Sequence, residues 1–366
     1  MFLQAAPNYW AAQGTWNRAR SHRRGAGDFA RGLTTTSRPR REQQRVSDMI
    51  ASSTDSVSTF DERGLLVVGP GVLGRLVATL WHEQFPTAHV VAESRTPASH
   101  GALRSTLPFL ELRLAQASAV NVPRFRHVVF CAPPSQNEDY VGAVRRAVEQ
   151  YWSGAESPED TATFIFTSSV GVYREPTTPA TVLREDSPVV TEPTEPGASP
   201  SALKLLACEE AVRAANGTVL RLAGLYNLER GPHRFWLSQG KVRGDPEGLI
   251  SLVSYHDAAR AVVAALQQPQ LHGETLVVVD GQPLSRRQIC EIARQHPLYA
   301  NYSMPTFEDD QASTKSRPPG KRFDATQSRA KLGQFKYDFE SFAAFMEQMA
   351  GREDVVSGHH ARMDRA

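Results

Sequence analysis

Residues 65–74 constrain the fold more than any other stretch of this chain. Four apolar residues, Leu65 to Val68, lead directly into GPGVLG, which places glycines at positions 69, 71 and 74. A continuous apolar run is typical of a parallel strand that is covered on both faces. After the glycines, apolar side chains recur at spacings of three and four, as in an amphipathic helix. TAHVVAESR (87–95) then follows as a second strand, so the stretch predicts a β–turn–α–β unit.

The same alternation continues along the chain. Apolar runs predict strands at 127–132, 163–169, 218–226 and 274–280, and helical patterns occur at 138–151, 201–215, 257–267, 285–295 and 339–349. Strands that alternate with helices predict an α/β fold with a doubly wound parallel sheet of the Rossmann type. We expect this domain to span 62–280 and a small C-terminal, substrate-side region to span 281–350. The stretch 175–200, which contains six prolines, and the polar stretch 301–322 are expected to be loops.

Composition limits the class of protein. Of 366 residues, 40% are hydrophobic, which supports a substantial core. No uninterrupted apolar run approaches the ~20 residues that a membrane-spanning helix needs, so no membrane span is expected. The three cysteines, Cys131, Cys208 and Cys290, are far apart and form no paired motif. This pattern argues against a disulfide framework or a zinc site, so no metal is expected, and it suits a reducing compartment.

Charge is distributed unevenly. Residues 1–47 contain nine arginines, no lysine and two acids, so this stretch carries 9 − 2 = +7, and the remainder carries 2 − 7 = −5. A basic, acid-poor leader is typical of an organelle transit peptide. The alternative is a disordered basic arm that binds nucleic acid, but no such pattern continues into the body, so targeting is favoured. We predict a transit peptide and linker over 1–58, with RGLTTTS (31–37) as the cleavage region, and a disordered tail over 351–366.

Each glycine of GPGVLG has a physical role in holding a dinucleotide. Gly69 permits the tight turn, Gly71 lets the backbone approach a pyrophosphate, and Gly74 lets the helix pack closely on the strand. The helix N-terminus, with Val72 and Leu73 in its first turn, offers free N–H groups and a positive dipole to the phosphates. The alternative is a glycine-rich connection without a ligand. It is less favoured because strand, turn and helix occur in the required order.

The end of the second predicted strand selects between two cofactors. NAD-binding proteins usually place an acid here to hold the ribose 2′-hydroxyl. Glu93 lies 19 residues after Gly74, close to the expected spacing of about 20. Strand alternation, however, places Ser94 at the usual acid position and leaves Arg95 facing an adenosine 2′-phosphate, with which a guanidinium pairs well. NADP is therefore the preferred cofactor and NAD the alternative. For Arg95 the other interpretation is an ordinary surface charge.

Four further stretches carry a family resemblance. They are TSSVGVY (167–173), REDSP (184–188), VLRLAGLYNLERGP (219–232) and LVSYHDAARAVVAAL (252–266). With the glycine turn, they resemble the extended, epimerase/dehydratase-like branch of the short-chain dehydrogenase/reductase superfamily, over most of residues 63–345. The resemblance implies a Rossmann fold and a nicotinamide cofactor. It also implies an active-site serine four residues before the tyrosine of TSSVGVY, and the serine at that position is Ser169.

The resemblance also implies cofactor contacts from the loop after the fourth strand. This loop lies along the dinucleotide in the family, and here it begins CAPPSQ (131–136). The implied contacts are Cys131, Ala132 and Pro133. Cys131 is either a thiol beside the cofactor or an inert side chain, as buried strand cysteines usually are.

The family's catalytic helix begins Tyr-x-x-x-Lys, and this chain departs from that pattern. The lysine matches Lys204, but the tyrosine position holds Pro200, flanked by Ser199 and Ser201. The family's tyrosine exchanges a proton with the substrate oxygen, and proline has no proton to exchange. Locally, Pro200 suits the first position of a helix that Ser199 caps. Lys204 is either a retained contact to the nicotinamide ribose or a solvated helix lysine. Ser169 is either a substrate contact or a strand-end serine bonded to the backbone.

Other groups near the predicted strand ends are candidates for the missing acid. Tyr173 and Tyr226 lie close to such ends, and Tyr255 and His256 precede a helix that Asp257 is expected to cap. Imidazole titrates near neutrality and so suits proton transfer. A structural role is nevertheless favoured for each of these side chains.

Two functions remain open. The first is an NAD(P)-dependent oxidoreductase or epimerase-like enzyme acting on a small carbonyl or sugar-type substrate, with Ser169 and Lys204 in its active site. The second is a non-catalytic NADP-binding sensor, or an assembly or scaffold protein of an organelle. Nucleic-acid binding through the leader is least favoured, so no nucleic-acid partner is expected. The resemblance further implies a homodimer through the helix that carries Lys204 and its neighbour. It favours the chloroplast, with the mitochondrion as the alternative.

Overall fold

The structure, a computed structural model, describes residues 61–115, 123–135, 137–155, 157, 160–178, 180–308 and 320–351. The predicted transit peptide and linker, the cleavage region, and all but the first residue of the predicted tail lie outside the described residues. Within the described ranges, no helix combines the length and the apolar character that crossing a membrane requires.

A seven-stranded sheet forms the centre of the described chain, and all of its strands run parallel. In spatial order the strands are β12 (Thr275–Val278), β7 (Thr218–Leu222), β5 (Thr163–Ser169), β4 (His127–Phe130), β1 (Leu65–Val68), β2 (Val90–Ser94) and β3 (Glu111–Leu114). The strands β1, β4 and β7 are buried along their whole length, as expected between two layers of helices. The order reverses direction between β1 and β4, which is where sheets of this kind bind ligands. The predicted doubly wound α/β fold is confirmed.

The register of the sheet brings predicted site residues together. The last residue of β1 pairs with the penultimate residue of β2 and with the last residue of β4. Gly69, Ser94 and Cys131 therefore lie next to one another at the carboxyl edge of the sheet. Because Phe166 of β5 pairs with the last residue of β4, β5 continues past that edge to Ser169.

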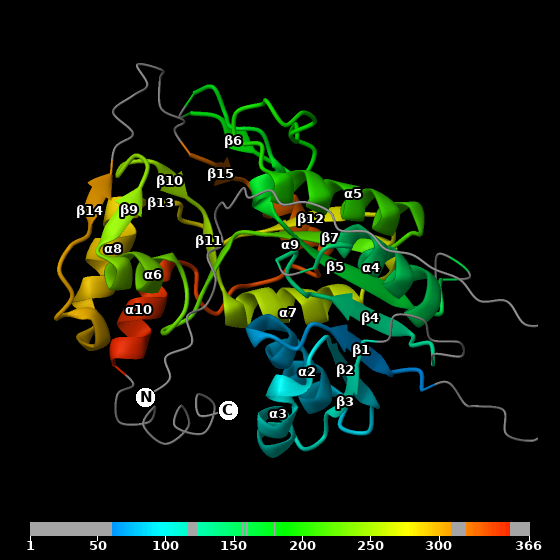
Figure 1. The fold of residues 1–366 in the computed structure, drawn as a ribbon. Helices are drawn as coiled ribbons and strands as arrows, with labels where there is room; N and C mark the ends of the chain where they lie inside the picture. The colour runs from blue at the N-terminus through cyan, green and yellow to red at the C-terminus, as the bar shows by residue number, and fades with distance from the viewer. Residues whose placement is uncertain are drawn as a thin grey trace, which may run out of the picture. The chain divides into compact units, whose positions relative to one another are not determined.

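Two pairs of helices cover the sheet. Helix α2 (Val72–Gln84) packs against α7 (Tyr255–Leu266) on one face, and α4 (Tyr140–Arg146) packs against α5 (Pro200–Ala214) on the other (Figure 1). Helix α4 continues as a π-helical turn, η2 (Ala147–Tyr151). The shorter helices of this region are η1 (Pro97–Ser99), α3 (His100–Thr106), η3 (Val170–Val172), η4 (Pro269–Leu271) and α9 (Thr326–Lys331).

A smaller lobe is built from segments that are far apart in the sequence. Its helices are α6 (Pro232–Gln239), α8 (Arg286–Gln295), η5 (Pro297–Tyr299) and α10 (Phe342–Ala350). Its strand pairs are β8 (Gly224–Tyr226) with β11 (Leu252–Ser254), β9 (Lys241–Arg243) with β14 (Thr306–Glu308), and β10 (Leu249–Ile250) with β13 (Leu284–Ser285). A last pair, β6 (Val182–Leu183) with β15 (Arg322–Phe323), joins the loop after β5 to the C-terminal part of the chain.

The smaller lobe has its own hydrophobic cluster, separate from the main core. The cluster combines residues of 226–252 with residues of 289–346. The hydrophobic core of this lobe is therefore formed by residues from separate parts of the chain. The sequence-based division into 62–280 and 281–350 stays a prediction.

Some predicted elements need correction. The strand expected over 218–226 is two strands, because the chain leaves the central sheet at Ala223 and continues as β8 beside β11. The stretch 301–322, predicted to be a loop, contributes β14 and the start of β15. The elements β3, α3, α6 and α9 were not predicted, because each is short and none contains the continuous apolar run by which the short strands β1 and β4 were recognised. Such short elements show too few repeats for a periodic pattern to be recognised.

Candidate dinucleotide-binding site

The glycine turn after β1 is closed on one side by the neighbouring strand. Gly69 has a φ of +97°, and a Cβ built there would lie 2.5 Å from the backbone N and Cα of Ala132. A Cβ at Gly74 would lie 2.4 Å from the Gly69 carbonyl oxygen and 2.9 Å from the Val67 side chain. Both positions therefore require glycine. Gly69 is needed for its backbone conformation and close approach, and Gly74 for the packing of α2 on β1.

Gly71 differs from the other two glycines because the space beside it is open. Among the described residues, no atom lies within 4 Å of a Cβ built at Gly71, and its φ of −73° suits any residue. Gly71 is the N-cap of α2, and no described side chain caps this helix end. The first N–H groups of a helix, here those of Val72 and Leu73, have no intrahelical partner. The opening thus lies at the positive end of α2, where helix N–H groups and the helix dipole favour an anion.

Glu93 is already engaged at the end of β2. It is buried and accepts a hydrogen bond from Nε of Arg113 on β3 at 2.9 Å. Burial raises the pKa of the Glu93 carboxyl, against the opposing effect of Arg113. A carboxylate that is paired in this way is not presented to a ribose. The arrangement is consistent with the expectation that Ser94, and not Glu93, occupies the position beside the ligand.

Ser94 lies in a small polar group that the sequence analysis only partly foresaw. Its hydroxyl donates to the Thr96 carbonyl oxygen at 2.8 Å, and Oγ lies 2.7 Å from Nε2 of His100. Arg95 follows directly and is exposed. His100, a buried residue at the start of α3, was not predicted, because nothing in the sequence links this short helix to the end of β2.

The residues after β4 lie beside the turn. The Cys131 thiol donates to the Gly69 carbonyl oxygen at 3.3 Å, and burial raises its pKa to about 12. The thiol therefore stays protonated at neutral pH, in line with the interpretation of Cys131 as an inert side chain. Ala132 closes the turn at Gly69, and its carbonyl oxygen accepts the Tyr140 hydroxyl at 2.8 Å. Pro133 comes next and is exposed.

Ser169 ends β5 and caps the turn that follows it. Its Oγ accepts the N–H of Gly171 at 3.0 Å, which is the bond expected of a structural strand-end serine. In this bond the hydroxyl is the acceptor, so its own hydrogen can still be donated to a ligand. Both interpretations of Ser169 are therefore compatible with the geometry.

Helix α5 begins at Pro200, as the sequence predicts. Oγ of Ser199 accepts the N–H of Ala202 at 3.1 Å and caps the helix. In a parallel β–α–β unit the helix runs antiparallel to the strands, so its N-terminus lies at the carboxyl edge of the sheet. Helix α5 also packs against η3, which follows Ser169. The structure therefore brings the first turn of α5, with the exposed Lys204, to the same edge as Ser169.

A buried ion pair fixes α5 to the sheet near this edge. Glu209, which has no exposed surface, accepts hydrogen bonds from Arg221 at 2.7 Å and from Ser168 at 2.6 Å. The Arg221 guanidinium carbon lies 4.6 Å from the centre of the Tyr173 ring. The Tyr173 hydroxyl donates to the Glu185 carbonyl oxygen at 3.1 Å, and burial raises its pKa. Tyr173 is therefore enclosed and does not replace the missing tyrosine. The pair was not predicted, although Arg221 stands out as a charge within an apolar run.

Two further tyrosines are also structural. Tyr226 and Asp280 lie in the smaller lobe with 0% and 1% of their surface exposed. Burial raises the pKa of both groups, that of Asp280 to about 8. A carboxyl that titrates near neutrality suits an acid catalyst, but these groups are sealed from any ligand. Tyr255 opens α7 and packs against the main core.

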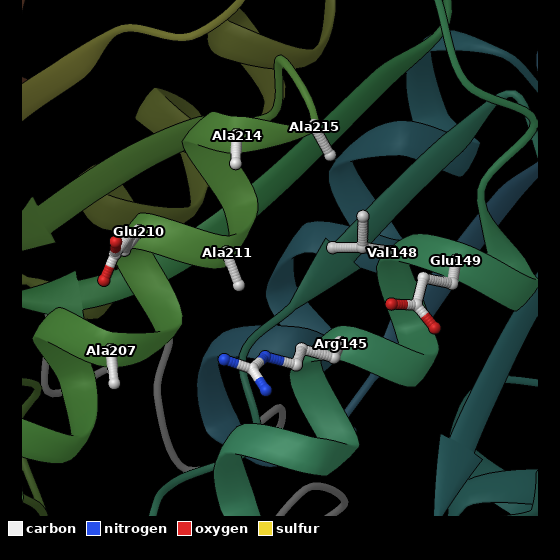
Figure 2. A pocket seen from close by; sticks show the side chains of 8 residues that line it. All are labelled: Arg145, Val148, Glu149, Ala207, Glu210, Ala211, Ala214 and Ala215. Atoms are coloured by element: carbon white, nitrogen blue, oxygen red, sulfur yellow. The ribbon is translucent and has the colours of Figure 1, made fainter.

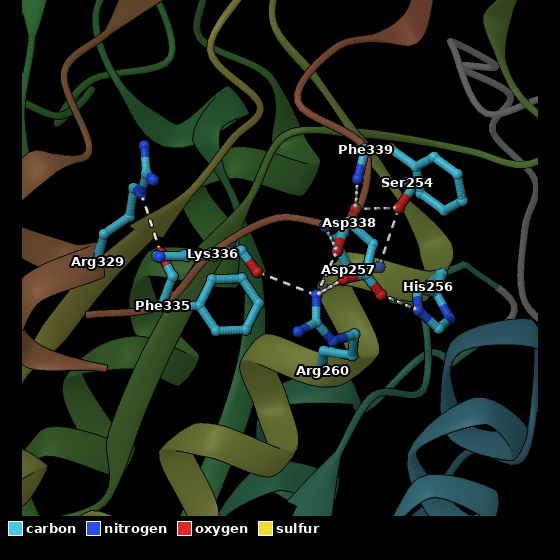
Figure 3. Close-up of polar contacts among 9 residues, drawn as sticks. All are labelled: Ser254, His256, Asp257, Arg260, Arg329, Phe335, Lys336, Asp338 and Phe339. Atoms are coloured by element: carbon cyan, nitrogen blue, oxygen red, sulfur yellow. Dashed lines mark hydrogen bonds and ion pairs between the residues drawn. The ribbon is translucent and has the colours of Figure 1, made fainter. Parts of the chain in front are cut away.

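The expectation that Asp257 caps α7 is wrong. The cap is Ser254, whose Oγ accepts the Asp257 N–H at 2.9 Å. The buried Asp257 carboxylate instead accepts the backbone N–H groups of Asp338 at 2.8 Å and Phe339 at 3.1 Å (Figure 3). Nε2 of His256 lies 2.8 Å from the Asp338 carboxylate. The conspicuous Tyr-His-Asp sequence therefore ties α7 to the C-terminal segment, which is a structural role.

The pair α4 and α5 carries a groove of about 410 Å³. Figure 2 shows Ala207, Ala211 and Ala214 of α5 along one side and Arg145 and Val148 along the other. The groove lies along the helices that cover the sheet and is not the opening beside the glycine turn. Within the part of the chain that the structure describes, no group of three or more His, Cys, Asp or Glu is placed to hold a metal ion.

No family model matches the chain, and no curated protein matches it. Solved structures do match. A functionally unknown conserved protein from Silicibacter pomeroyi aligns with a TM-score of 0.60 and 17% identity, over 79% of this chain and 98% of its own. UDP-glucuronic acid 4-epimerase from Bacillus cereus, in complex with NAD, aligns with a TM-score of 0.56 and 17% identity, over 78% and 99%. dTDP-glucose 4,6-dehydratase from Bacillus anthracis, in complex with NAD, aligns with a TM-score of 0.59 and 12% identity, over 82% and 99%. The chain thus has the fold of NAD-dependent epimerases and dehydratases; identities this low establish the fold alone.

Proposed function

We propose that this protein binds a nicotinamide dinucleotide at the GPGVLG turn and acts as an oxidoreductase or epimerase-like enzyme on a small carbonyl or sugar-type substrate. One observation carries the proposal. The turn is closed at Gly69 and Gly74, where strand and helix meet, and open at Gly71, where a diphosphate would lie. Two enzymes of the same fold, a UDP-glucuronic acid 4-epimerase and a dTDP-glucose 4,6-dehydratase, are in complex with NAD.

The chain's own residues divide the work at this site. The N-terminal N–H groups of α2 hold the diphosphate. The Lys204 ammonium, one turn into α5, would hold the nicotinamide ribose, and the Ser169 hydroxyl would donate its free hydrogen to the substrate oxygen. The bound nicotinamide supplies or accepts hydride. Because Pro200 has no proton to exchange, a group elsewhere in the chain, or water, must exchange the proton with the substrate.

We further propose that the preferred dinucleotide is NADP, with NAD as the alternative. Glu93 is paired with Arg113 and leaves Ser94 and Arg95 at the position that meets the adenosine ribose. A serine and a guanidinium accommodate a 2′-phosphate, which an acid would repel. Calorimetric titration with NADPH and with NADH tests both parts of this proposal. Failure to bind either dinucleotide contradicts the site itself, and tighter binding of NADH contradicts the preference.

The alternative function is a non-catalytic NADP-binding sensor or an assembly factor of an organelle. Pro200, together with the enclosure of Tyr173 and Tyr226, favours it. The two functions differ in turnover. A panel of carbonyl compounds and nucleotide sugars, monitored by NADPH absorbance, separates them. Binding without turnover of any compound supports the sensor, whereas measurable turnover supports the enzyme.

We also propose a homodimer and an organelle location. The alanines of α5 leave little side-chain bulk along the α4–α5 groove, so the same helices of a second copy can approach closely. The substitution Ala211→Arg should convert a dimer into a monomer in light-scattering measurements, and an unchanged mass would contradict this interface. The arginine-rich residues 1–58 support import into the chloroplast, or alternatively the mitochondrion. A fluorescent fusion of these residues that stays in the cytosol would contradict this part of the proposal.

A further inference from the structure

Lys321 is a half-buried lysine in a chain that rarely uses lysine. Of the 41 lysines and arginines, only six are lysines. The Lys321 side chain is 13% exposed, although lysine is almost never buried without a partner. Lysine also differs from arginine chemically, because burial shifts its pKa readily and lets it give up its proton. A mostly buried lysine in a chain that mainly uses arginine therefore suggests that Lys321 functions through transfer of its proton.

The contacts of Lys321 hold its ammonium in one place. Nζ donates to the Tyr173 carbonyl oxygen at 2.6 Å and lies 3.3 Å from Oε1 of Glu175. The backbone is held as well, because the Lys321 carbonyl oxygen accepts the Ser251 hydroxyl at 2.9 Å. An ammonium has three hydrogens, so these two partners leave one for a ligand.

These contacts place Lys321 between the segment that follows Ser169 and the segment that precedes Pro200. Tyr173 directly follows η3, the turn that Ser169 caps and against which α5 packs. A Cβ built at Gly197, three residues before Pro200, would lie 2.8 Å from Cγ of Glu175. The Lys321–Glu175 pair therefore bridges the segment after β5 and the segment before α5. Strand β15 begins at the next residue and pairs with β6, in the loop that follows β5 (Figure 1).

We propose that Lys321, oriented by Glu175, is the proton-donating residue of this site and takes the place of the tyrosine that Pro200 replaces. The proposal rests on the function proposed above. In the reducing direction, a bound reduced nicotinamide would supply hydride to the substrate carbonyl carbon and would itself be oxidised. The carbonyl oxygen takes a proton from the Lys321 ammonium. A hydroxyl forms, the lysine becomes a neutral amine, and water returns its proton.

The charged surroundings suit this role. Burial lowers the pKa of Lys321, and the carboxylate of Glu175 acts in the opposite direction. Glu175 in turn faces the Arg286 guanidinium, which donates to the carbonyl oxygens of Asp245 and Gly248 at 3.2 Å. Among the described residues, Oε2 of Glu175 is buried and has no hydrogen-bond partner. Glu175 thus lies between Lys321 and Arg286, and its carboxyl group opposes the effect of burial on the pKa of Lys321.

A titration of the full-length protein labelled with [6-¹³C]lysine tests the proposal without a known substrate. Six lysines give six signals, which Lys→Arg substitutions assign. The Lys321 midpoint should lie below the ordinary value for lysine of 10.5. It should be lower in the NADP⁺ complex than in the NADPH complex, by about half a pH unit or more, because a positive ring nearby disfavours an ammonium.

The pair Lys331–Glu274 supplies the matched control, since its ion pair of 2.8 Å is 33% and 40% exposed. Glu175→Gln should lower the Lys321 midpoint further, whereas Glu274→Gln, which removes the partner of another lysine, should leave the Lys321 midpoint unchanged. If both dinucleotides bind but the Lys321 midpoint is the same in the NADP⁺ and NADPH complexes, the Lys321–Glu175 pair has only a structural role and the proposal is overturned. The proposed dinucleotide site would stand in that case. If neither dinucleotide binds, the proposed function fails and this inference fails with it.

Discussion

Replacing Gly71 by alanine should separate the stability of the protein from its ability to bind a dinucleotide. A methyl group at Gly71 meets no described atom within 4 Å, and the φ of −73° suits alanine. Reduced freedom of the unfolded chain favours the variant by about 0.4–1 kcal/mol, and the poorer helix cap opposes it by a similar amount. The free energy of unfolding should therefore stay within about 0.5 kcal/mol of the wild type. The methyl group nevertheless occupies the space of the diphosphate, so dinucleotide affinity should fall at least tenfold, or about 1.4 kcal/mol.

Gly69→Ala is the matched control for this prediction. Its φ of +97° and the 2.5 Å approach to Ala132 should cost roughly 2–5 kcal/mol of folding stability, from backbone strain and overpacking together. Urea unfolding measures the stability of both variants, and the quenching of protein fluorescence by NADPH measures their binding. A Gly71→Ala variant that folds normally and binds NADPH as tightly as the wild type would show that no diphosphate approaches this turn.

Three further changes should have separable effects. Arg95→Gln should weaken NADPH binding about tenfold, because it removes a charged hydrogen bond, and should leave NADH binding unchanged in fluorescence titrations. An equal loss of affinity for NADPH and NADH would show that Arg95 does not contact the 2′-phosphate. Glu209→Ala should cost about 3–5 kcal/mol in urea unfolding because it leaves the buried Arg221 unpaired, whereas Glu210→Ala on the exposed side of α5 should cost under about 0.5 kcal/mol. Burial lowers the pKa of His127 from 6.5 to about 4, so the unfolded chain binds the proton more tightly. Stability should therefore fall as the pH drops from 6.5 toward 4, by up to about 3 kcal/mol, and less steeply in His127→Gln; parallel curves for the two proteins would contradict this assignment.

Local patterns predicted the parts of the fold that depend on local physics. The apolar run at β1, the glycines at 69, 71 and 74, and the serine–proline start of α5 all describe short segments whose conformation their own residues determine. The structure places each of them as expected, and the geometry at Gly69 and Gly74 gives the steric reason for glycine. The parallel sheet followed from the alternation of strands and helices, because such strands need crossover helices.

The parts that the sequence did not reveal depend on contacts between different elements, and some of these contacts span long stretches of chain. Lys321 and Tyr173 are 148 residues apart, and no periodic pattern connects them. His100 meets Ser94 through a short helix, and Glu209 meets Arg221 across the interior. The conspicuous Asp257 was assigned to the nearest helix end, although its main partners lie 81 and 82 residues away. A residue that the sequence assigns to its own helix can thus contact a distant segment of the chain instead.

The position of Pro200 on the exposed first turn of α5 has a consequence for how such a protein changes its chemistry. The helix is anchored two turns further on by Glu209, so the side chain at position 200 contributes little to holding the scaffold together. A substitution at position 200 should therefore change the free energy of folding little, whether or not the new side chain can carry a proton. A proton carrier can consequently be added or removed at this edge by one substitution, while the geometry of the glycine turn at Gly69, Gly71 and Gly74 stays unaltered.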